Sequence, residues 1–413
     1  MDGSIIQLDV TNIAHGGVCV ARHEGRVVFV SDAIPGETVL ARVSESSKKS
    51  FWRAETVSAL SASPFRQPHV WAAASIDREP DDRAGGAEFG HITLAHQREL
   101  KRQVLADSLA RMAHVNPLFE VEAAEGDNER SGTGWRTRVG LHVDDQGRLG
   151  PFAARSHRVI PVHDLPLATD ELAAAVPWGD RFLGHERLDL LVTSSGSSPS
   201  HSSVRIRLGD QKPTTITEWV GEREFLLADN GFWQVHREAA STLTSAVQQA
   251  IDVELFDPTA PNLDLYGGVG MLAAAVCDRF GPRTRITTVE SDSAASEYAA
   301  ENLRDFIEAS AATGRVERWL RMGVTQASGN EASRMRKATV ILDPPRSGAG
   351  RDVIQNLGLM KPAQMIYVAC DPVALARDTE FLAHEGYRLA SVRAFDLFPN
   401  THHLEAVAQF VSA

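Results

Sequence analysis

A glycine turn between a predicted strand and a predicted helix constrains the fold of this chain more than any other feature. In the stretch LDLYGGVGMLAAAV, an apolar strand leads through Gly267, Gly268 and Gly270 into an apolar helix. Glycines there let a ligand approach the backbone at the N-terminus of the helix. Glu290 ends the next predicted strand, RITTVE, at the distance of about 20 residues that suits a carboxylate binding ribose hydroxyls. A dinucleotide fold would give the same signal, and so would a tight turn without a ligand.

The whole segment after Gly231 alternates predicted strands with predicted helices. The candidate strands are NLDLY, RITTVE, TVILD, QMIYVA and YRLASVRAF. This alternation is typical of a parallel sheet with crossover helices. We therefore expect residues 231–413 to form a Rossmann-like α/β domain with its ligands at the C-terminal ends of the strands.

The first 60 residues have a different pattern, with short runs of alternating apolar and polar residues separated by turn residues. This predicts a small antiparallel barrel. The phrase GGVCVARHEGRVVFVSDAIPGETV resembles the TRAM module, an OB-like barrel appended to RNA-modifying enzymes. OB-like barrels commonly bind nucleic acid on an open strand face. The alternative is a barrel that only packs on its neighbour.

Residues 61–230 are expected to form a central α+β domain. Residues 61–92 show no sustained period and are predicted to be irregular, and the serine-rich stretch 194–203 is predicted to be a solvated loop. Candidate strands are RVGLHV, LDLLVT and SVRIRL. One long amphipathic helix is predicted over residues 94–115, because apolar residues recur at helical spacing at Leu100, Val104, Leu105, Leu109 and Met112.

Length and charge limit the classes of protein that remain. A chain of 413 residues suggests two or three domains. The formal net charge of −12 weakens a simple nucleic-acid interpretation, although local clusters such as WRTR and RIR remain candidates for phosphate contacts. The sequence has no signal-peptide pattern and no apolar run of roughly 18 residues, so a cytoplasmic protein without a membrane partner is expected.

The stretch TVILDPPRSGAG contains a more specific motif. A predicted strand ends in Asp343, and the two prolines that follow make the backbone leave the sheet stiffly. Asp-Pro-Pro at such a point resembles the catalytic loop of methyltransferases that modify exocyclic amines, in which an aromatic residue follows. Arg346 follows here, which favours a carbon target that needs a separate nucleophile.

Cys370 is the candidate nucleophile. The three cysteines Cys19, Cys277 and Cys370 are too few and too far apart for a disulfide framework or a metal site, so free thiols are expected. Cys370 lies where the apolar run MIYVA gives way to Asp-Pro, at the mouth of a predicted strand. The alternative is a buried thiol that packs as a small hydrophobe. Cys277 and Cys19 are expected to lie in the core and in a barrel strand.

A thiolate at this position suits methylation of a pyrimidine. The C5 carbon of uracil is a poor nucleophile, but addition of a thiolate to C6 generates an enolate that can accept a methyl group at C5. A base must then remove the C5 proton. Glu405 precedes the apolar run AVAQFV beside His402 and His403, and a partly buried carboxylate with a raised pKa suits that role. The alternative is a surface glutamate with two loop histidines.

These segments together resemble the RNA 5-methyluridine (uracil-5) methyltransferase family, which uses S-adenosylmethionine. The similar segments are FWQVH, DLYGG, LDPPRSG, YVACDPVALARD and FPNTHHLEAV. The resemblance implies Cys370 as nucleophile and Glu405 as base. It also implies that the helix at 94–115 packs on the catalytic domain. The implied S-adenosylmethionine site consists of Gln234, Tyr266, Gly268, Gly270, Met271, Glu290 and Asp343.

The chain departs from the family at one cofactor site. Many members hold an iron-sulfur cluster through cysteines of the central domain, whereas this chain has Ala84, Ala87 and Leu165 at three of those positions. Without thiolates the cluster cannot be held, so no iron or other metal is expected and packing must stabilise this domain. His236 and Gly268 replace the family's asparagine and cysteine, which are milder changes.

The expected partner is therefore RNA, either transfer or ribosomal, with no DNA and with a monomeric protein. One alternative is a catalytically inactive RNA-binding protein that retains the fold; the lost cluster and the acidic charge favour it slightly, but the intact set of Cys370, Glu405 and Asp-Pro-Pro does not. The other is an amine methyltransferase, which Arg346 disfavours and which leaves Cys370 unexplained.

Overall fold

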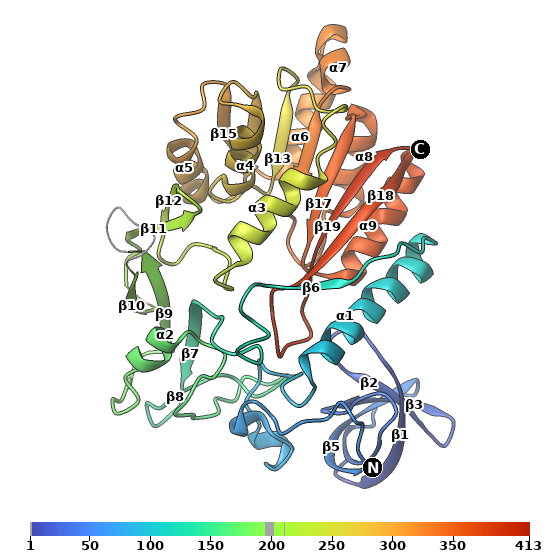
Figure 1. Cartoon of the computed structure of the whole chain (residues 1–413). Helices are drawn as coiled ribbons and strands as arrows, with labels where there is room; N and C mark the ends of the chain where they lie inside the picture. The colour runs from blue at the N-terminus through green and yellow to red at the C-terminus, as the bar shows by residue number, and fades with distance from the viewer. Residues whose placement is uncertain (1, 195–201, 210) are drawn as a thin grey trace.

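The computed structural model describes residues 2–194, 202–209 and 211–413. A barrel at the N-terminus, a central sheet and a larger α/β sheet follow one another along the chain, and helix α1 runs between the barrel and the α/β sheet (Figure 1). Residues 195–201 of the predicted serine-rich loop lie outside the described residues. Among the described residues, no helix has the length and apolar character needed to cross a membrane.

The N-terminal strands close into a barrel with the order β1-β2-β3-β5-β4. Alternate side chains point inward, so Val28 and Val30 are buried while Phe29 between them is half-buried on the outer wall. The prediction of an antiparallel barrel is wrong for one pair, because β3 and β5 run parallel. The chain leaves β3, forms β4, and returns antiparallel to β4 in the gap between them. The strands are β1 (Ile5–Ile13), β2 (Cys19–His23), β3 (Arg26–Ser31), β4 (Thr38–Glu45) and β5 (Phe51–Ser61).

The connection after the barrel is mainly irregular, as predicted, with two short 3-10 helices, η1 (Ala72–Ala74) and η2 (Pro80–Asp82). The predicted helix over 94–115 is present as α1 (Leu94–Ser108), which continues into the π-helical turn η3 (Leu109–Ala113). Leu100 packs in the barrel core, whereas Leu105 and Leu109 pack in the core of the α/β sheet. Helix α1 therefore joins the barrel to the α/β domain.

The central sheet has the order β12-β11-β9-β7-β8, with β10 paired to β9. The three predicted strands of this region are confirmed, and β11 and β12 were not predicted. The elements are β7 (Arg138–Val143), β8 (Leu149–Gly150), α2 (Asp170–Ala175), β9 (Arg187–Ser194), β10 (Ser202–Leu208), β11 (Thr215–Val220) and β12 (Arg223–Ala228).

Three positions at which the resemblance implies cluster cysteines belong to an apolar core in this chain. Ala84, Ala87 and Leu165 are buried and share one hydrophobic cluster with Trp71 and Trp135. Within the described ranges, no group of three or more His, Cys, Asp or Glu side chains is arranged to hold a metal ion. Packing of apolar side chains thus fills this part of the central domain.

The C-terminal sheet has the order β15-β14-β13-β16-β17-β19-β18-β6. The strands from β15 to β17 are parallel, and β19 then runs antiparallel to β17. The strands are β6 (Val121–Ala123), β13 (Asn262–Leu265), β14 (Ile286–Glu290), β15 (Ala309–Thr313), β16 (Thr339–Leu342), β17 (Gln364–Ala369), β18 (Tyr387–Asp396) and β19 (Glu405–Ser412). This is the predicted Rossmann-like α/β arrangement, with a β-hairpin added at one edge.

Helices cover both faces of this sheet (Figure 1). One apolar cluster contains Leu105 and Leu357, and the other contains Leu243 and Leu272. Strand β17 is buried along its whole length because it lies in the middle of the sheet between these layers. The helices are α3 (Ala239–Ala250), α4 (Met271–Phe280), α5 (Ser293–Asn302), α6 (Val316–Gln326), α7 (Gly329–Met335), α8 (Gly350–Met360) and α9 (Pro372–His384).

Candidate active site

The carboxyl ends of the parallel strands meet at one edge of the C-terminal sheet. Leu265 of β13 pairs with Leu342 of β16, and Leu342 pairs with Tyr367 of β17. The backbone N–H of Asp343, the residue after β16, donates to the carbonyl of Leu265 at 3.2 Å. Asp343 therefore lies between the glycine turn after β13 and the end of β17, at the edge where open α/β sheets bind ligands.

The glycine turn packs closely against its neighbours at Gly267 and faces open space at Gly268. The backbone N–H groups of Tyr266 and Gly267 both donate to the carbonyl of Val289, at 2.9 and 3.2 Å. A Cβ on Gly267 would lie 1.8 Å from the hydroxyl of Thr288, so no side chain fits there. Gly268 has a φ of +54°, and a Cβ on it would meet nothing within 4 Å. A ligand can therefore approach the backbone at Gly268.

The other predicted donor-site residues of this turn lie beside Gly268. Gly270 is the left-handed residue that precedes α4, and Met271 is the first residue of that helix. Glu290 ends β14, and its Oε2 accepts a hydrogen bond from the N–H of Gly268 at 3.1 Å. Its Oε1 accepts from the N–H of Asp292 at 2.7 Å. These bonds fix the carboxylate beside the turn, where it can receive hydroxyl groups of a ribose.

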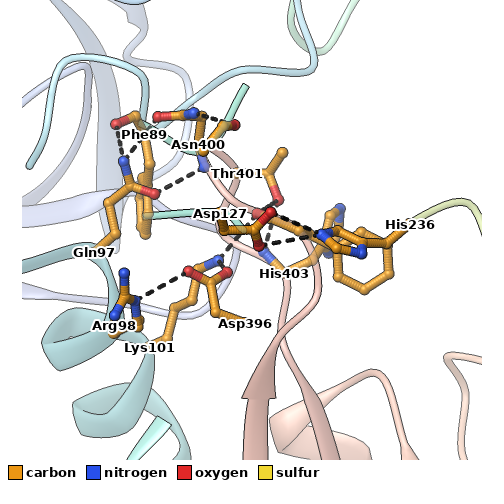
Figure 2. Close-up of polar contacts among 12 residues, drawn as sticks. Phe89, Gln97, Arg98, Lys101, Asp127, His236, Asp396, Asn400, Thr401 and His403 are labelled. Atoms are coloured by element: carbon orange, nitrogen blue, oxygen red, sulfur yellow. Dashed lines mark hydrogen bonds and ion pairs between the residues drawn. The ribbon is translucent and has the colours of Figure 1, made fainter. Parts of the chain in front are cut away.

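Gln234 lies in the segment that joins β12 to α3, and its side chain is buried. The preceding Trp233 packs in the large apolar cluster that also contains Val269 of the glycine turn. His236 is also buried, and its Nε2 lies 3.1 Å from a carboxylate oxygen of Asp127 (Figure 2). The segment that carries Gln234 is thus held in place on both sides of this residue.

Two acidic side chains stand at the strand ends, Asp264 in β13 and Asp343 after β16. Burial raises the pKa of Asp343 to about 7, and the negative charge of Asp264 adds to the rise. Burial also raises the pKa of Asp264 to about 7, although its Oδ2 accepts hydrogen bonds from the Thr288 hydroxyl and the Ala273 N–H. Its Oδ1 is buried and has no partner in the described part of the chain. A cation bound at this edge would be attracted by both carboxylates.

Cys370 lines a pocket of about 240 Å³ between the barrel and the C-terminal sheet. The loop between β1 and β2 (residues 14–17) forms one wall, Lys101 of α1 lies at another, and His402 and His403 form a third. The barrel loop comes so close that a Cβ on Gly17 would lie 2.6 Å from the Cβ of His402. The pocket beside the candidate nucleophile therefore depends on contact between two domains.

Glu405 faces Cys370 across two neighbouring strands. Ala369 of β17 pairs with Ala406 of β19 in antiparallel register, so Cys370 and Glu405 are the next facing pair at the ends of these strands. Facing residues of an antiparallel pair direct their side chains to the same side of the sheet. The structure therefore brings together the candidate nucleophile and the candidate base.

Burial dominates the electrostatics of this pair. The pKa of Cys370 is raised to about 12, first by burial and then by the charges of Glu405 and Asp343, while Arg346 opposes the rise. Burial and the charge of Asp343 also raise the pKa of Glu405 well above its ordinary value. The carboxyl groups raise the thiol pKa only while they are ionised, so the three groups titrate as one coupled set. In the resting protein the Cys370 thiol therefore holds its proton at neutral pH.

Several pocket residues were not predicted from the sequence. Arg346 was noted only as the residue after Asp-Pro-Pro, but its guanidinium lies 3.5 Å from Nε2 of His403. Burial lowers the pKa of His403 to about 3, with further lowering by the charges of His402 and Arg346. His15 and Lys101 come from segments far from the motifs, and no sequence signal marked either as part of this site.

The other two cysteines are core residues, as predicted. Cys19 begins β2 and its thiol donates to the carbonyl of Ala33, while Cys277 lies inside α4. Both are buried, whereas Cys370 is partly exposed. Only Cys370 among the three combines access to a pocket with a facing carboxyl group.

Comparisons with known proteins show the family to which this chain is similar. The family model described as tRNA (Uracil-5-)-methyltransferase matches residues 234–411, and the TRAM domain model matches residues 1–54. An uncharacterized RNA methyltransferase of Streptomyces avermitilis is 34% identical, with 98% of each chain covered. An uncharacterized RNA methyltransferase of Bifidobacterium longum is 31% identical, with 98% of this chain and 96% of that chain covered.

A solved structure shows the same fold over the full length. The tRNA (uracil-54, C5)-methyltransferase of Pyrococcus abyssi, in complex with S-adenosyl-L-homocysteine, aligns with a TM-score of 0.67 at 20% identity. The alignment covers 98% of this chain and 99% of that chain. The fold and the site thus define a methyltransferase with a Rossmann-like catalytic domain and an N-terminal TRAM barrel. This chain belongs to the tRNA (uracil-5-)-methyltransferase family, which confirms the predicted family and fold class.

Proposed function

We propose that this protein transfers a methyl group from S-adenosylmethionine to C5 of a uridine in RNA, through a covalent bond between Cys370 and C6 of the base. The observation that carries this proposal is the position of Cys370, in a pocket wall and directly across the strand ends from Glu405. Family membership supports the reaction class.

The residues at the sheet edge fit S-adenosylmethionine. The backbone at Gly268 faces open space, Glu290 is fixed beside it, and the buried Oδ1 of Asp264 lacks a partner. When bound, this cofactor supplies an electrophilic methyl group on a positively charged sulfur. Asp264 and Asp343 would attract that charge. Gln234, Tyr266, Gly270 and Met271 would form the remaining contacts, and the S-adenosylhomocysteine in the Pyrococcus abyssi structure supports a donor of this kind.

The chain's own residues carry the chemistry on the base. The Cys370 thiol gives up its proton to water and its sulfur bonds to C6 of uracil, which moves the π electron pair of the C5–C6 double bond into an enolate. After C5 has been methylated, the Glu405 carboxylate removes the C5 proton. The electron pair of that C–H bond re-forms the C5–C6 double bond and expels the sulfur as a thiolate.

The raised pKa values of both groups suit this sequence. A thiol with a pKa of about 12 is seldom ionised, but its thiolate is a strong nucleophile once formed. Arg346 is the positive charge that favours this ionisation. A carboxylate with a raised pKa is likewise a stronger base for the C5 proton. Burial therefore strengthens both groups, and it leaves only a small fraction of the Cys370 thiol ionised at neutral pH.

RNA binding is assigned to the barrel and the pocket mouth. On the outer wall of the barrel, the rings of Phe29 and Phe51 lie 5.3 Å apart, centroid to centroid. The guanidinium of Arg53 lies 5.9 and 5.5 Å from these two ring centroids, and the ammonium of Lys48 lies 4.8 Å from that of Phe51. Aromatic rings flanked by cations stack on unpaired bases and attract phosphates. The target uridine would have to leave its stack to reach Cys370.

Nucleoside analysis tests the proposed reaction. Unmodified transfer and ribosomal RNA transcripts are incubated with the protein and methyl-labelled S-adenosylmethionine, then digested and separated. The label is expected in 5-methyluridine, and Cys370→Ala is expected to abolish it. Label in another nucleoside would contradict the proposal. RNA binding without any labelled product would favour a catalytically inactive RNA-binding protein.

A further inference from the structure

The loop that leads into Glu405 is held by a network of buried polar side chains that the reaction scheme does not use. This loop (residues 397–404) joins β18 to β19 and extends away from the sheet toward the N-terminal end of α1 (Figure 1). Its members His402 and His403 line the Cys370 pocket. The position of the loop therefore affects both the pocket wall and the start of β19, where Glu405 lies.

A pair of amide side chains forms the centre of this network. Gln97 of α1 accepts a hydrogen bond from the backbone N–H of Asn400 at 2.8 Å and donates one to the side-chain oxygen of Asn400 at 2.9 Å (Figure 2). Both residues are fully buried. Asn400 also has a φ of +63°, a conformation that favours glycine or asparagine. Because buried amides need their partners, this pair holds the tip of the loop in one position.

A second contact holds the start of the loop to the same face of α1. Lys101 lies one turn after Gln97, so both side chains point the same way. Its ammonium lies 2.5 Å from the carboxylate of Asp396, the last residue of β18, and donates to the carbonyl of Phe398 at 3.1 Å (Figure 2). The Lys101 side chain is fully buried and that of Asp396 almost so. The helix thus contacts the last residue of β18 and the loop residues Phe398 and Asn400.

The network also reaches the central domain and the segment beside the barrel. The side-chain amide of Asn400 donates to the carbonyl of Gly132 at 2.7 Å. The carbonyl of Asn400 accepts from the N–H of Phe89, a residue that packs in the barrel core. Cys370, by contrast, is held separately, since it directly follows β17 and precedes the Asp371 carboxylate that caps α9.

We propose that Gln97 and Asn400 are positioning residues for Glu405, and that they act on the last step of the reaction, removal of the C5 proton. This inference rests on the proposed function. Glu405 is needed only after the sulfur has added and C5 has been methylated. A weakened Gln97–Asn400 pair therefore slows release of the methylated uracil from Cys370 more than it slows formation of the covalent bond. The covalent protein–RNA complex then accumulates with ordinary uridine RNA.

The test measures the covalent complex and turnover in the same reactions. Asn400→Gly removes the side-chain bonds but keeps a backbone that tolerates positive φ, and Gln97→Met removes the partner amide at similar volume. Each variant is mixed with uridine RNA and S-adenosylmethionine and examined on denaturing gels, with Glu405→Gln as the reference for a missing base. Arg102→Ala removes an ion pair with Glu99 on the partly exposed side of α1 and serves as the control.

Turnover of Asn400→Gly and Gln97→Met is expected to fall about tenfold, the effect of losing one hydrogen-bonded pair in the transition state, while the covalent fraction rises severalfold. Arg102→Ala should match the wild type in both. A parallel fall of turnover and covalent fraction, or no change in either, would overturn the proposal. If Asn400→Gly and Gln97→Met do not fold, Thr401→Val, which removes the hydroxyl bond to Phe398, is judged by the same criteria.

Wild-type protein that forms no covalent complex with 5-fluorouridine RNA would point to failure of the proposed function itself. Wild-type protein that forms this complex, beside variants that lose complex and turnover together, would reject only the positioning role.

Discussion

Nε2 of His15 in the barrel lies 3.3 Å from a carboxylate oxygen of Asp371, the residue that follows Cys370. This contact joins the loop between β1 and β2 to the strand end that carries the candidate nucleophile. The same carboxylate caps α9, because its other oxygen accepts hydrogen bonds from the N–H groups of Val373 and Ala374. The barrel loop is therefore part of the wall of the Cys370 pocket.

The aromatic pair on the barrel should contribute to RNA affinity and not to chemistry. Replacing both Phe29 and Phe51 by alanine is expected to weaken RNA binding about tenfold, the loss typical of one stacked base. The rate at saturating RNA should not change, because neither ring lies in the Cys370 pocket. Fluorescence anisotropy with labelled RNA measures the first quantity and a methylation assay the second. Leu118→Ala, which shortens a fully exposed apolar side chain, is the control. Unchanged affinity in the double variant would argue against this surface.

The Cys370 thiol should resist alkylation at neutral pH. With a pKa of about 12, only about one thiol in 10⁴ is ionised at pH 8. The rate of modification by iodoacetamide, followed by mass spectrometry of the Cys370 peptide, should still be rising at pH 10. Free cysteine measured in parallel shows the ordinary pH dependence. A rate that levels off below pH 8 would mean that the resting site stabilises the thiolate.

Asp343→Asn should raise the stability of the fold in a pH-dependent way. The pKa of this carboxyl is raised from 3.8 to about 7, so well below pH 3.8 it is neutral in both the folded and the unfolded state. As the pH rises from about 4 to about 7, the unfolded state is increasingly favoured because its carboxyl ionises first, and above pH 7 the cost stays constant. Asparagine avoids this cost and should add on the order of 2 kcal/mol at pH 8. The full difference in pKa would correspond to roughly 4 kcal/mol, and the smaller value allows for solvent screening because Asp343 is only half-buried.

Urea unfolding at pH 4 and pH 8 measures the effect of Asp343→Asn. The variant should gain free energy of unfolding at pH 8 and almost none at pH 4. Equal gains at both pH values would show that ionisation of Asp343 is not the cause. Methylation activity should be lost in the same variant, because the Asp343 carboxylate lies at the sheet edge proposed to bind S-adenosylmethionine.

Removal of metal ions should leave the fold unchanged. The positions occupied by Ala84, Ala87 and Leu165 are packed into an apolar cluster that does not depend on a metal. The melting temperature should therefore be the same with and without an iron chelator, and the visible spectrum of the protein should show no iron-sulfur absorption. A fall of several degrees on chelation would contradict this account of the central domain.

The sequence patterns predicted most of the framework because their signals are local. Period-two runs marked the barrel, the glycine turn marked the start of α4, and apolar spacing marked α1. Strand β15 was missed because its sequence, ASAAT, is short and lacks large β-branched residues. The parallel pair of β3 and β5 was missed because register between distant strands leaves no local signal.

The site was predictable only in part, because contacts between residues far apart in the sequence also leave no local signal. Cys370, Glu405 and Asp343 stand in recognisable motifs, and the structure places all three at one edge of the sheet. Gln97 and Lys101 interrupt the apolar pattern of α1 and would normally indicate a solvated face. They are buried because their partners, Asn400 and Asp396, come from a loop about 300 residues away, which single-sequence periodicity cannot reveal.

The central claim is that the sulfur of Cys370 bonds to the target base, and trapping with 5-fluorouridine RNA tests it most directly. Fluorine at C5 leaves no proton for Glu405 to remove, so the complex cannot break down. The account predicts a stable protein–RNA band on a denaturing gel that depends on S-adenosylmethionine, with the RNA attached to the Cys370 peptide by mass spectrometry. An equally strong band from Cys370→Ala, or attachment at another residue, would contradict it.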